Sequence, residues 1–312
     1  MDDTTLAALR LAASALVDVA FACAVGALAT ALTLAGGASA WRATRERGTL
    51  RVLGVAAGVA LLGELALLWI EAMTMADVGP AAAFDELRGV VAGTQWGHAW
   101  ACGFASLALL FSAHFGVRRG WGDLRVIAVL ACIVFALARA GGGHAGANGF
   151  GRATIVMAVH LLATAAWAGL VFVAALVVLR ADAAGIDLAP ADRAAWLRWL
   201  STCATIALAL VAATGIAAAL SETGPTLAPL VSSPWGFVLD AKLALVALAI
   251  ALGAHNRFVT LPPLLAALAG ARPDAELQQR FARVLRIEAV VLLAVLLAAA
   301  ALANGEPPPV AV

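Results

Sequence analysis

The sequence predicts an all-α polytopic membrane protein, a bundle of eight transmembrane helices with both termini on the periplasmic side. Three observations lead to this fold class. Hydrophobic residues make up 63% of the 312 residues and charged residues 12%, whereas a soluble domain is nearer half apolar and a quarter charged. Eight apolar stretches are long enough to cross the hydrocarbon core. The basic residues between them are divided unevenly, which gives the orientation.

The eight stretches are predicted to be helices, because a helix satisfies its backbone polar groups internally within lipid. They lie at about 7–36, 50–73, 88–115, 124–140, 154–179, 198–220, 237–255 and 286–304. No long polar segment separates them, so residues 1–312 are expected to form a single transmembrane domain. The acidic start Met1-Asp2-Asp3 lacks the basic region of a cleaved signal peptide, and the first stretch is therefore expected to be a permanent helix.

The orientation follows from the distribution of basic residues. Fifteen of the 20 lie in the loops after the first, third, fifth and seventh stretches: Arg42, Arg45, Arg47, Arg51, Arg118, Arg119, Arg125, Arg180, Arg193, Arg198, Arg257, Arg272, Arg280, Arg283 and Arg286. The other five are Arg10, Arg88, Arg139, Arg152 and Lys242. Because cytoplasmic loops are the arginine-rich ones, these four loops are predicted to face the cytoplasm of a bacterium, with the chain in its inner membrane.

Several function classes are not expected. A formal net charge of +1 gives no indication of a nucleic-acid partner. The four cysteines form no CxxC pair, so neither a disulfide framework nor a zinc ribbon is predicted. The sequence contains no nucleotide-binding fingerprint and no nucleophile–base arrangement, and an enzyme is therefore not expected. The expected partner is the lipid bilayer, and the sequence leaves the oligomeric state open.

Polar and sulfur-bearing side chains at membrane depth are the candidate functional residues, because each is costly unless it faces the bundle interior or water. In the predicted orientation, six of them fall in the outer half of the membrane or in an outer loop: Met73, Met75, His98, His144, Met157 and His160. Three helices carry stripes of such residues. The stripes are Met157 with His160, Thr94 with His98 and Cys102, and Glu64 with Glu71 and Met75. We predict that they face one another and form a metal-binding cavity open to the outside.

The chemistry of these ligands indicates copper. Imidazole nitrogen binds either oxidation state, whereas thioether sulfur selects Cu(I). Zinc is less favoured, because no thiolate cluster accompanies the histidines. Residues predicted to balance the charge of the ion or to line a transport path are Asp18, Glu64, Glu71, Cys102, His114, His255 and Glu288. An intramembrane histidine is often only an interhelical hydrogen-bond donor, and His114 and His255 are expected at the cytoplasmic interface. Copper is therefore one of several interpretations at this point.

A series of short motifs runs through residues 90–308. They are Thr94-x-x-Gly97-x-x-Trp100, His160 with Trp167-x-Gly169-Leu170, Ser233-Pro234-Trp235-Gly236, Lys242-Leu243, Gly253-x-His255-Asn256-Arg257 with Pro262 and Leu264, Arg286-x-Glu288, and Pro307-Pro308. In this order they resemble the CopD family of copper resistance and copper homeostasis membrane proteins. One position departs from the family, which often has a second glycine where this chain has Leu170. The departure affects helix packing more than metal ligation.

The resemblance implies an eight-helix inner-membrane protein that handles copper, commonly viewed as moving the ion from the periplasm to the cytoplasm. It makes the copper ion, Cu(I) or Cu(II), the preferred ligand and His160 the first candidate among the functional residues. A periplasmic copper chaperone is a possible donor of the ion.

Two alternatives stay open. The first is a membrane b-type cytochrome, in which pairs of histidines hold haem. His98 and His114 are 16 residues apart, about 160° beyond four turns at roughly 100° per residue, which disfavours two stacked haems but not a single outer haem with His160. The second alternative is a copper-binding scaffold or sensor that does not transport the ion.

Overall fold

The computed structural model describes residues 2–146, 149–179, 189–223, 233–270 and 274–305, and these residues form helices without strands. The elements are α1 (Asp3–Leu34), α2 (Ala40–Ala76), α3 (Ala83–Gly93), α4 (Gln95–Arg118), α5 (Leu124–Gly142), η1 (His144–Gly146), α6 (Arg152–Val173), η2 (Ala174–Val178), α7 (Pro190–Thr223), α9 (Pro234–His255), η3 (Asn256–Thr260), α10 (Leu261–Ala269) and α11 (Ala275–Asn304). Eight spans within them are long and apolar enough to cross a membrane. The predicted all-α polytopic fold is confirmed.

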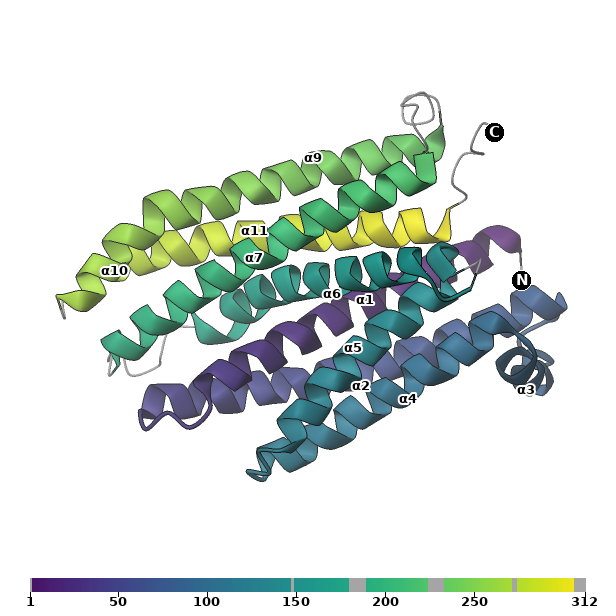
Figure 1. The fold of residues 1–312 in the computed structure, drawn as a ribbon, viewed down its shortest axis with the longest axis horizontal. Coiled ribbons are helices and arrows are strands. Elements are labelled where there is room, and N and C mark those ends of the chain that lie inside the picture. The colour runs from purple at the N-terminus through teal and green to yellow at the C-terminus, as the bar shows by residue number, and fades with distance from the viewer. Residues whose placement is uncertain (1, 147–148, 180–188, 224–232, 271–273, 306–312) are drawn as a thin grey trace.

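The bundle has two groups of helices with α6 between them (Figure 1). On one side α1 packs against α2, and α4 packs against α5 and α2. On the other side α9 packs against α11. Helix α6 contacts α1 and α5 of the first group and α7 and α11 of the second. A side chain on α6 can therefore face either group.

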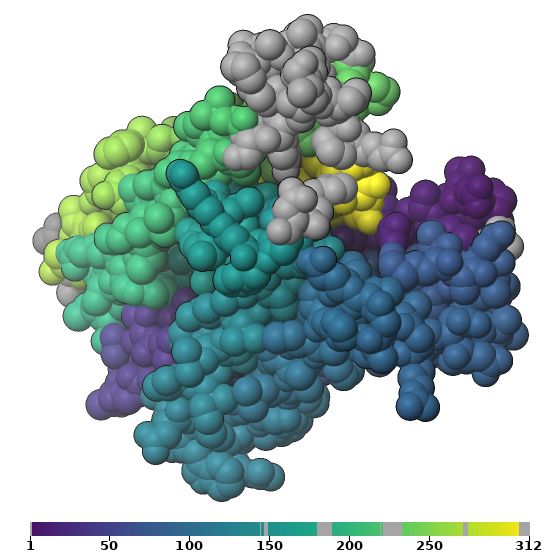
Figure 2. Space-filling view, turned by 45° about the vertical axis from the view of Figure 1, so that its right-hand side comes forward, coloured from purple at the N-terminus to yellow at the C-terminus, as the bar shows by residue number. Residues whose placement is uncertain are grey.

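Arginine-rich helix ends gather at one end of the bundle. The end of α1, the start of α2, the end of α4 and the start of α5 all lie opposite the N-terminus (Figure 1). Figure 2 turns the other end toward the viewer and shows the start of α1 and the last turns of α11 together on it. Of the predicted cytoplasmic arginines, Arg180 and Arg272 lie outside the described residues. The direction of the bundle in the membrane stays a prediction.

The prediction of one continuous helix over 88–115 is wrong, because the helix is interrupted at Thr94. This residue has extended backbone angles (φ −124°, ψ 148°), and its hydroxyl accepts a hydrogen bond from the amide of Gly97 at 2.8 Å. It is thus the N-cap of α4, a role that threonine fills well. Residues before it form the separate short helix α3. Thr94 therefore caps the helix that holds His98. It is not part of a polar stripe with His98 and Cys102 on one helix face, as predicted.

Other helices extend beyond their predicted bounds. Helix α2 begins at Ala40 rather than 50, α7 at Pro190 rather than 198, and α11 at Ala275 rather than 286. The predicted bounds followed apolarity, whereas the helical backbone continues through arginine-rich turns outside the apolar stretch. Capping side chains fix two of these starts. Ser39 accepts from the amide of Arg42 and Asp274 from the amide of Leu277.

Two spans change to π-helical geometry in their later part. Helix α6 continues as η2, and the backbone carbonyl of Val177 in η2 accepts a hydrogen bond from Arg45 at 3.1 Å. Helix α9 continues as η3, which begins at Asn256. Short π-helical segments inside helices occur frequently at functional sites.

Candidate functional site

His160 lies inside the bundle where α6 meets α7. It is eight residues after the start of α6, about 12 Å along the helix axis at 1.5 Å per residue. Its Nδ1 lies 3.0 Å from the hydroxyl oxygen of Thr214 on α7. A Cβ at Gly215 would lie 3.2 Å from Cε1 of the ring, so the glycine makes room for the imidazole. Lys242 of α9 acts on the ring electrostatically. The ring is thus held between α6 and α7, with a positive charge of α9 acting on it.

The other predicted outer-site residues lie in different environments. His98, in the first turn of α4, is exposed, and its Nε2 is 3.2 Å from the carbonyl oxygen of Ala92. Cys102, one turn later, is exposed as well. Met73 is buried in the core with 2% of its surface exposed, whereas Met75 is 48% exposed. Only Met157, half-buried one turn before His160, shares a helix face with that histidine.

Among the predicted residues whose side chains the structure describes, His98 and His160 are therefore not brought into one group. His160 faces α7, while His98 faces the end of α3. Across the described part of the chain, no three histidine, cysteine, aspartate or glutamate side chains are placed to hold a metal ion together. The backbone of His144 lies in η1, and its side chain lies outside the described part. Metal ligation by these residues stays a prediction.

Three of the four acidic residues expected to balance a copper charge or to line a path, Asp18, Glu64 and Glu71, have an arginine acting on them. Arg139 of α5 reaches across to α1, where it bonds Ser14 at 2.7 Å and pairs with Asp18 at 3.3 Å. The same guanidinium acts electrostatically on Glu64 of α2, which is 4% exposed. Nearer the N-terminal end, Glu71 of α2 pairs with Arg10 of α1. These pairs let ionised groups persist inside an apolar bundle.

Arg139 is a functional candidate that the sequence did not single out. It was counted only among the basic residues of the outer side, yet it pairs with Asp18. Lys242, which belongs to the motif series, acts on Asp18 and on His160. Asp18, Glu64, Arg139 and Lys242 carry formal charges that sum to zero. Asp18 and Glu64 themselves indicated that basic partners must lie nearby, because acidic groups at membrane depth need cationic partners.

The inner candidates differ from one another in burial. His114 is buried (3% exposed), not interfacial as expected, and its ring fills the space over Gly54, where a Cβ would lie 2.5 Å from Nε2. His255, the last residue of α9, is exposed. Glu288 of α11 is buried at 4% exposure, beside the side chains of Asn256 and Trp167. Glu288 forms no ion pair with a loop arginine in the described residues.

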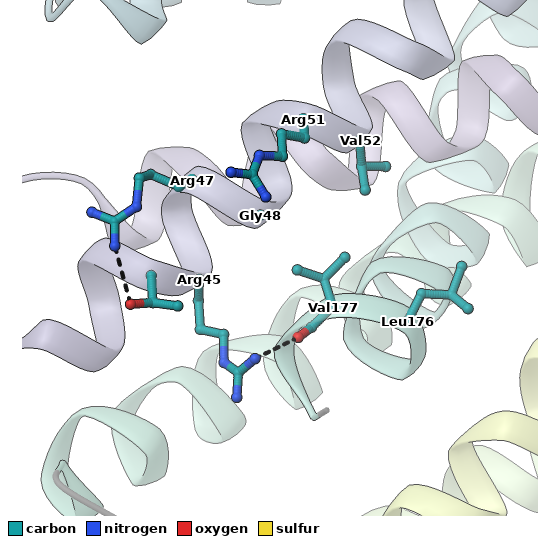
Figure 3. A pocket seen from close by; sticks show the side chains of 8 residues that line it. Arg45, Arg47, Gly48, Arg51, Val52, Leu176 and Val177 are labelled. Atoms are coloured by element: carbon teal, nitrogen blue, oxygen red, sulfur yellow. Dashed lines mark hydrogen bonds between the residues drawn. The ribbon is translucent and has the colours of Figure 1, made fainter. Parts of the chain in front are cut away.

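A cavity of about 630 Å³ opens at the arginine-rich end, between α2 and η2. Figure 3 shows Arg47 and Arg51 on the α2 wall and Leu176 and Val177 on the η2 wall, with Arg45 reaching from α2 to the carbonyl of Val177. Guanidinium groups attract anions and repel cations. This cavity is therefore not a copper site.

The fold and the paired charges inside it define a class, a multi-pass membrane protein with a polar interior. Comparison with protein families identifies the family within this class. Residues 194–302 match the family described as copper resistance protein D, and residues 1–154 match the N-terminal domain of copper resistance protein D-like proteins. The chain belongs to the copper resistance protein D family. The match includes the first 90 residues, in which the sequence showed no family motif. No curated protein and no solved structure gives a significant match.

The two matched regions correspond to the two helix groups of the fold. The first ends at the start of α6, and the second begins within α7. Most of α6, with His160 and the Trp167-x-Gly169 motif, lies between the matches. Pro307-Pro308 of the predicted series lies outside the described residues. The family match therefore supports copper as the context of this protein without identifying a ligand.

Proposed function

We propose that this protein binds copper inside the membrane at His160 and moves it from the periplasmic side toward the cytoplasm. Two findings support the proposal. The chain belongs to a copper resistance family, and His160 presents an imidazole within the bundle at the junction of its two helix groups. The geometry around His160 is the observation on which the proposal depends.

The hydrogen bonds at His160 determine which ring nitrogen is available to a metal. The Thr214 hydroxyl donates its one hydrogen to the carbonyl of Leu210, 2.6 Å away. Its oxygen must then accept from His160, so we assign the imidazole proton to Nδ1. The backbone of Val211 also acts on the ring. The lone pair of a neutral ring consequently lies on Nε2.

This arrangement is typical of a metal-binding histidine. Such a histidine usually donates its second ring N–H to a fixed acceptor, which sets the tautomer and the ring orientation. Met157, half-buried on the same helix face, adds a thioether within one turn. Imidazole and thioether together favour copper, and the thioether favours Cu(I).

The positive charge that acts on His160 also favours the smaller ionic charge. Lys242 acts on this ring, and Asp18 already has Arg139 as its partner. Since the cost of placing an ion in a low-dielectric interior rises steeply with its charge, Cu(I) is the expected form. From there the ion would leave past His114 or His255.

Copper binding to the purified full chain tests the proposal directly. The His160→Ala variant should bind at least one Cu(I) fewer per chain than the unaltered protein, whereas Cys203→Ala, a matched change on α7, should bind the same number. Unaltered protein in liposomes should then show saturable copper flux. Equal copper binding by His160→Ala and the unaltered protein would reject His160 as a ligand.

The alternatives give different outcomes in the same experiments. Copper binding without flux would support a scaffold or sensor and reject transport. A Soret absorption band in the purified protein that disappears in His160→Ala would support a b-type cytochrome.

A further inference from the structure

Glu288 lies near the middle of α11 and faces α6 and α9. It is 13 residues after Ala275, about 20 Å along the helix, and two residues inside the apolar stretch predicted at 286–304. Glu288 and Asn256 are each 4% exposed, and Trp167 is 3% exposed. A Cβ at Gly253 would lie 3.2 Å from Oε1 of Glu288, so this glycine lets the carboxyl group approach α9 closely. The carboxyl group is therefore deep in the bundle, in a space shaped to hold it.

No charged side chain opposes this carboxyl group in the part of the chain that the structure describes. The polar groups that act on it are the side chains of Asn256 and Trp167. Asp18 of α1 pairs with Arg139, and His160 of α6 bonds Thr214. Arg257 of η3 bonds Ser201 and Thr205, and Lys242 of α9 acts on Asp18 and His160. On α11 itself Arg286 is exposed, while η2 and α10 contain no titratable side chain.

An ionised carboxylate without a cationic partner is unfavourable when it is as buried as Glu288, which is 4% exposed. Asp18 has Arg139 as a direct partner at 3.3 Å, whereas Glu288 has no such neighbour in the described part of the chain. Neutralisation by a bound proton is the simplest alternative, because the facing groups are an amide and an indole N–H rather than a set of oxygen ligands suited to a metal ion.

The side chain of Asn256 can serve both protonation states of Glu288. Its Nδ2 is buried and has no hydrogen-bond partner, while its Oδ1 accepts from the Thr260 hydroxyl at 2.8 Å. The same hydroxyl lies 3.1 Å from the backbone carbonyl of Asn256. If the amide turns over, Thr260 can donate to that carbonyl instead, and Oδ1 can accept from a protonated Glu288. In the present orientation the amide N–H₂ is available to an ionised Glu288.

We propose that Glu288, Asn256 and Trp167 form a proton-binding site within the membrane, and that this proton is exchanged as copper moves. Glu288 releases its proton to water and later takes one up, while Trp167 and the amide of Asn256 stabilise the carboxylate in between. Exchange of one proton for one Cu(I) in opposite directions moves no net charge. The position of Asn256 at the start of η3 is consistent with such a role, because π-helical segments frequently accompany functional sites. The coupling, but not the proton site, rests on the proposed copper transport.

Infrared difference spectroscopy of the metal-free full chain tests the proton site without copper. A change of pH should produce a carboxylic-acid C=O band that is absent in Glu288→Gln and retained in Glu276→Gln, an exposed glutamate of the same helix. Trp167→Phe removes a donor to the carboxylate, so the acid band should persist to higher pH. This second variant keeps the test valid if Glu288→Gln fails to fold. A Glu288 that is ionised at every pH at which the protein stays folded would overturn the proposal.

Copper flux into liposomes under an imposed pH gradient tests the coupling. Flux through the unaltered protein should change with the gradient, and flux through Glu288→Gln should not. Flux that is equally sensitive in both proteins would reject coupling at Glu288. A complete lack of copper flux in the unaltered protein would reject the transport proposal instead, and the infrared result would then decide the proton site alone.

Discussion

Gly26 of α1 and Gly169 of α6 lie backbone against backbone. A Cβ built on either residue would overlap the main chain of the other helix: at Gly26 it would meet Gly169, and at Gly169 it would meet Ala22 and Gly26. Close approach of small residues is how helices associate within lipid, where the hydrophobic effect provides no drive. This contact joins α6 to the first helix group and sets the direction in which its side chains point.

A methyl group at this contact should destabilise the protein. Gly26→Ala gains about 1 kcal/mol of helix propensity but must separate the two helices, and overpacking of this kind costs about 1–3 kcal/mol. We expect thermal unfolding in detergent, followed by circular dichroism, to occur at a lower temperature. The control is Gly89→Ala in α3, where nothing lies within 4 Å. If both variants melt alike, the contact is not important for stability.

Removal of the Asp18 charge should leave Arg139 without its direct partner. The two side chains pair at 3.3 Å across α1 and α5 and are 22–23% exposed, whereas loss of one member of a fully buried pair costs about 3 kcal/mol. Glu64 still acts on Arg139, so the effect of Asp18→Asn should lie at or below that value in the free energy of unfolding. Glu276→Gln, which breaks an exposed pair with Arg280, should cost less than about 0.5 kcal/mol. An Asp18→Asn variant as stable as this control would contradict a structural role for the pair.

The fold could be predicted from the sequence, because a membrane span is recognised by counting apolar residues over a window of about 20 residues. The break at Thr94 was missed for the same reason, since Gly93-Thr94 lowers the apolarity of its stretch very little while the threonine caps a helix. The site was less predictable. Spacing places Met157 and His160 on one face of a helix, but it does not say which neighbour that face meets. The rotation of α6 depends on contacts such as that of Gly26 with Gly169, which join positions 143 residues apart.

The partners of single polar residues could not be predicted either, because spacing along one helix does not tell which other helix lies against it. His160 meets Thr214 at a separation of 54 residues, and Arg139 meets Asp18 at a separation of 121. No periodicity in the sequence links such positions. What the sequence did contain was the requirement for a partner, because a lone charge at membrane depth is costly. Applied to Asp18, that requirement leads to the few basic residues within or near the spans, among them Arg139 and Lys242.

Loss of the Thr214 hydroxyl should weaken copper binding without removing a ligand. Thr214→Val keeps the shape of the side chain but takes away the acceptor that holds the Nδ1 proton of His160. Loss of such an outer partner typically reduces metal affinity roughly 10- to 100-fold. A competition titration with a Cu(I) chelator would measure the change. Thr202→Val, which removes a hydroxyl bonded only to its own helix at Arg198, should leave the affinity unaltered. Equal affinities in the two variants would argue against a metal on Nε2 of His160.

The orientation of the bundle can be tested with two glycines in open space. Gly79, between α2 and α3, lies at the end of the bundle that holds the N-terminus, and Gly122, between α4 and α5, lies at the arginine-rich end; nothing lies within 4 Å of a Cβ at either position. In a chain whose four cysteines have been replaced, Gly79→Cys should react with a membrane-impermeant maleimide added outside intact cells. Gly122→Cys should react only after the membrane is opened, because arginine-rich loops stay on the cytoplasmic side. The reverse pattern would invert the predicted topology, and copper entering past His160 would then come from the cytoplasm.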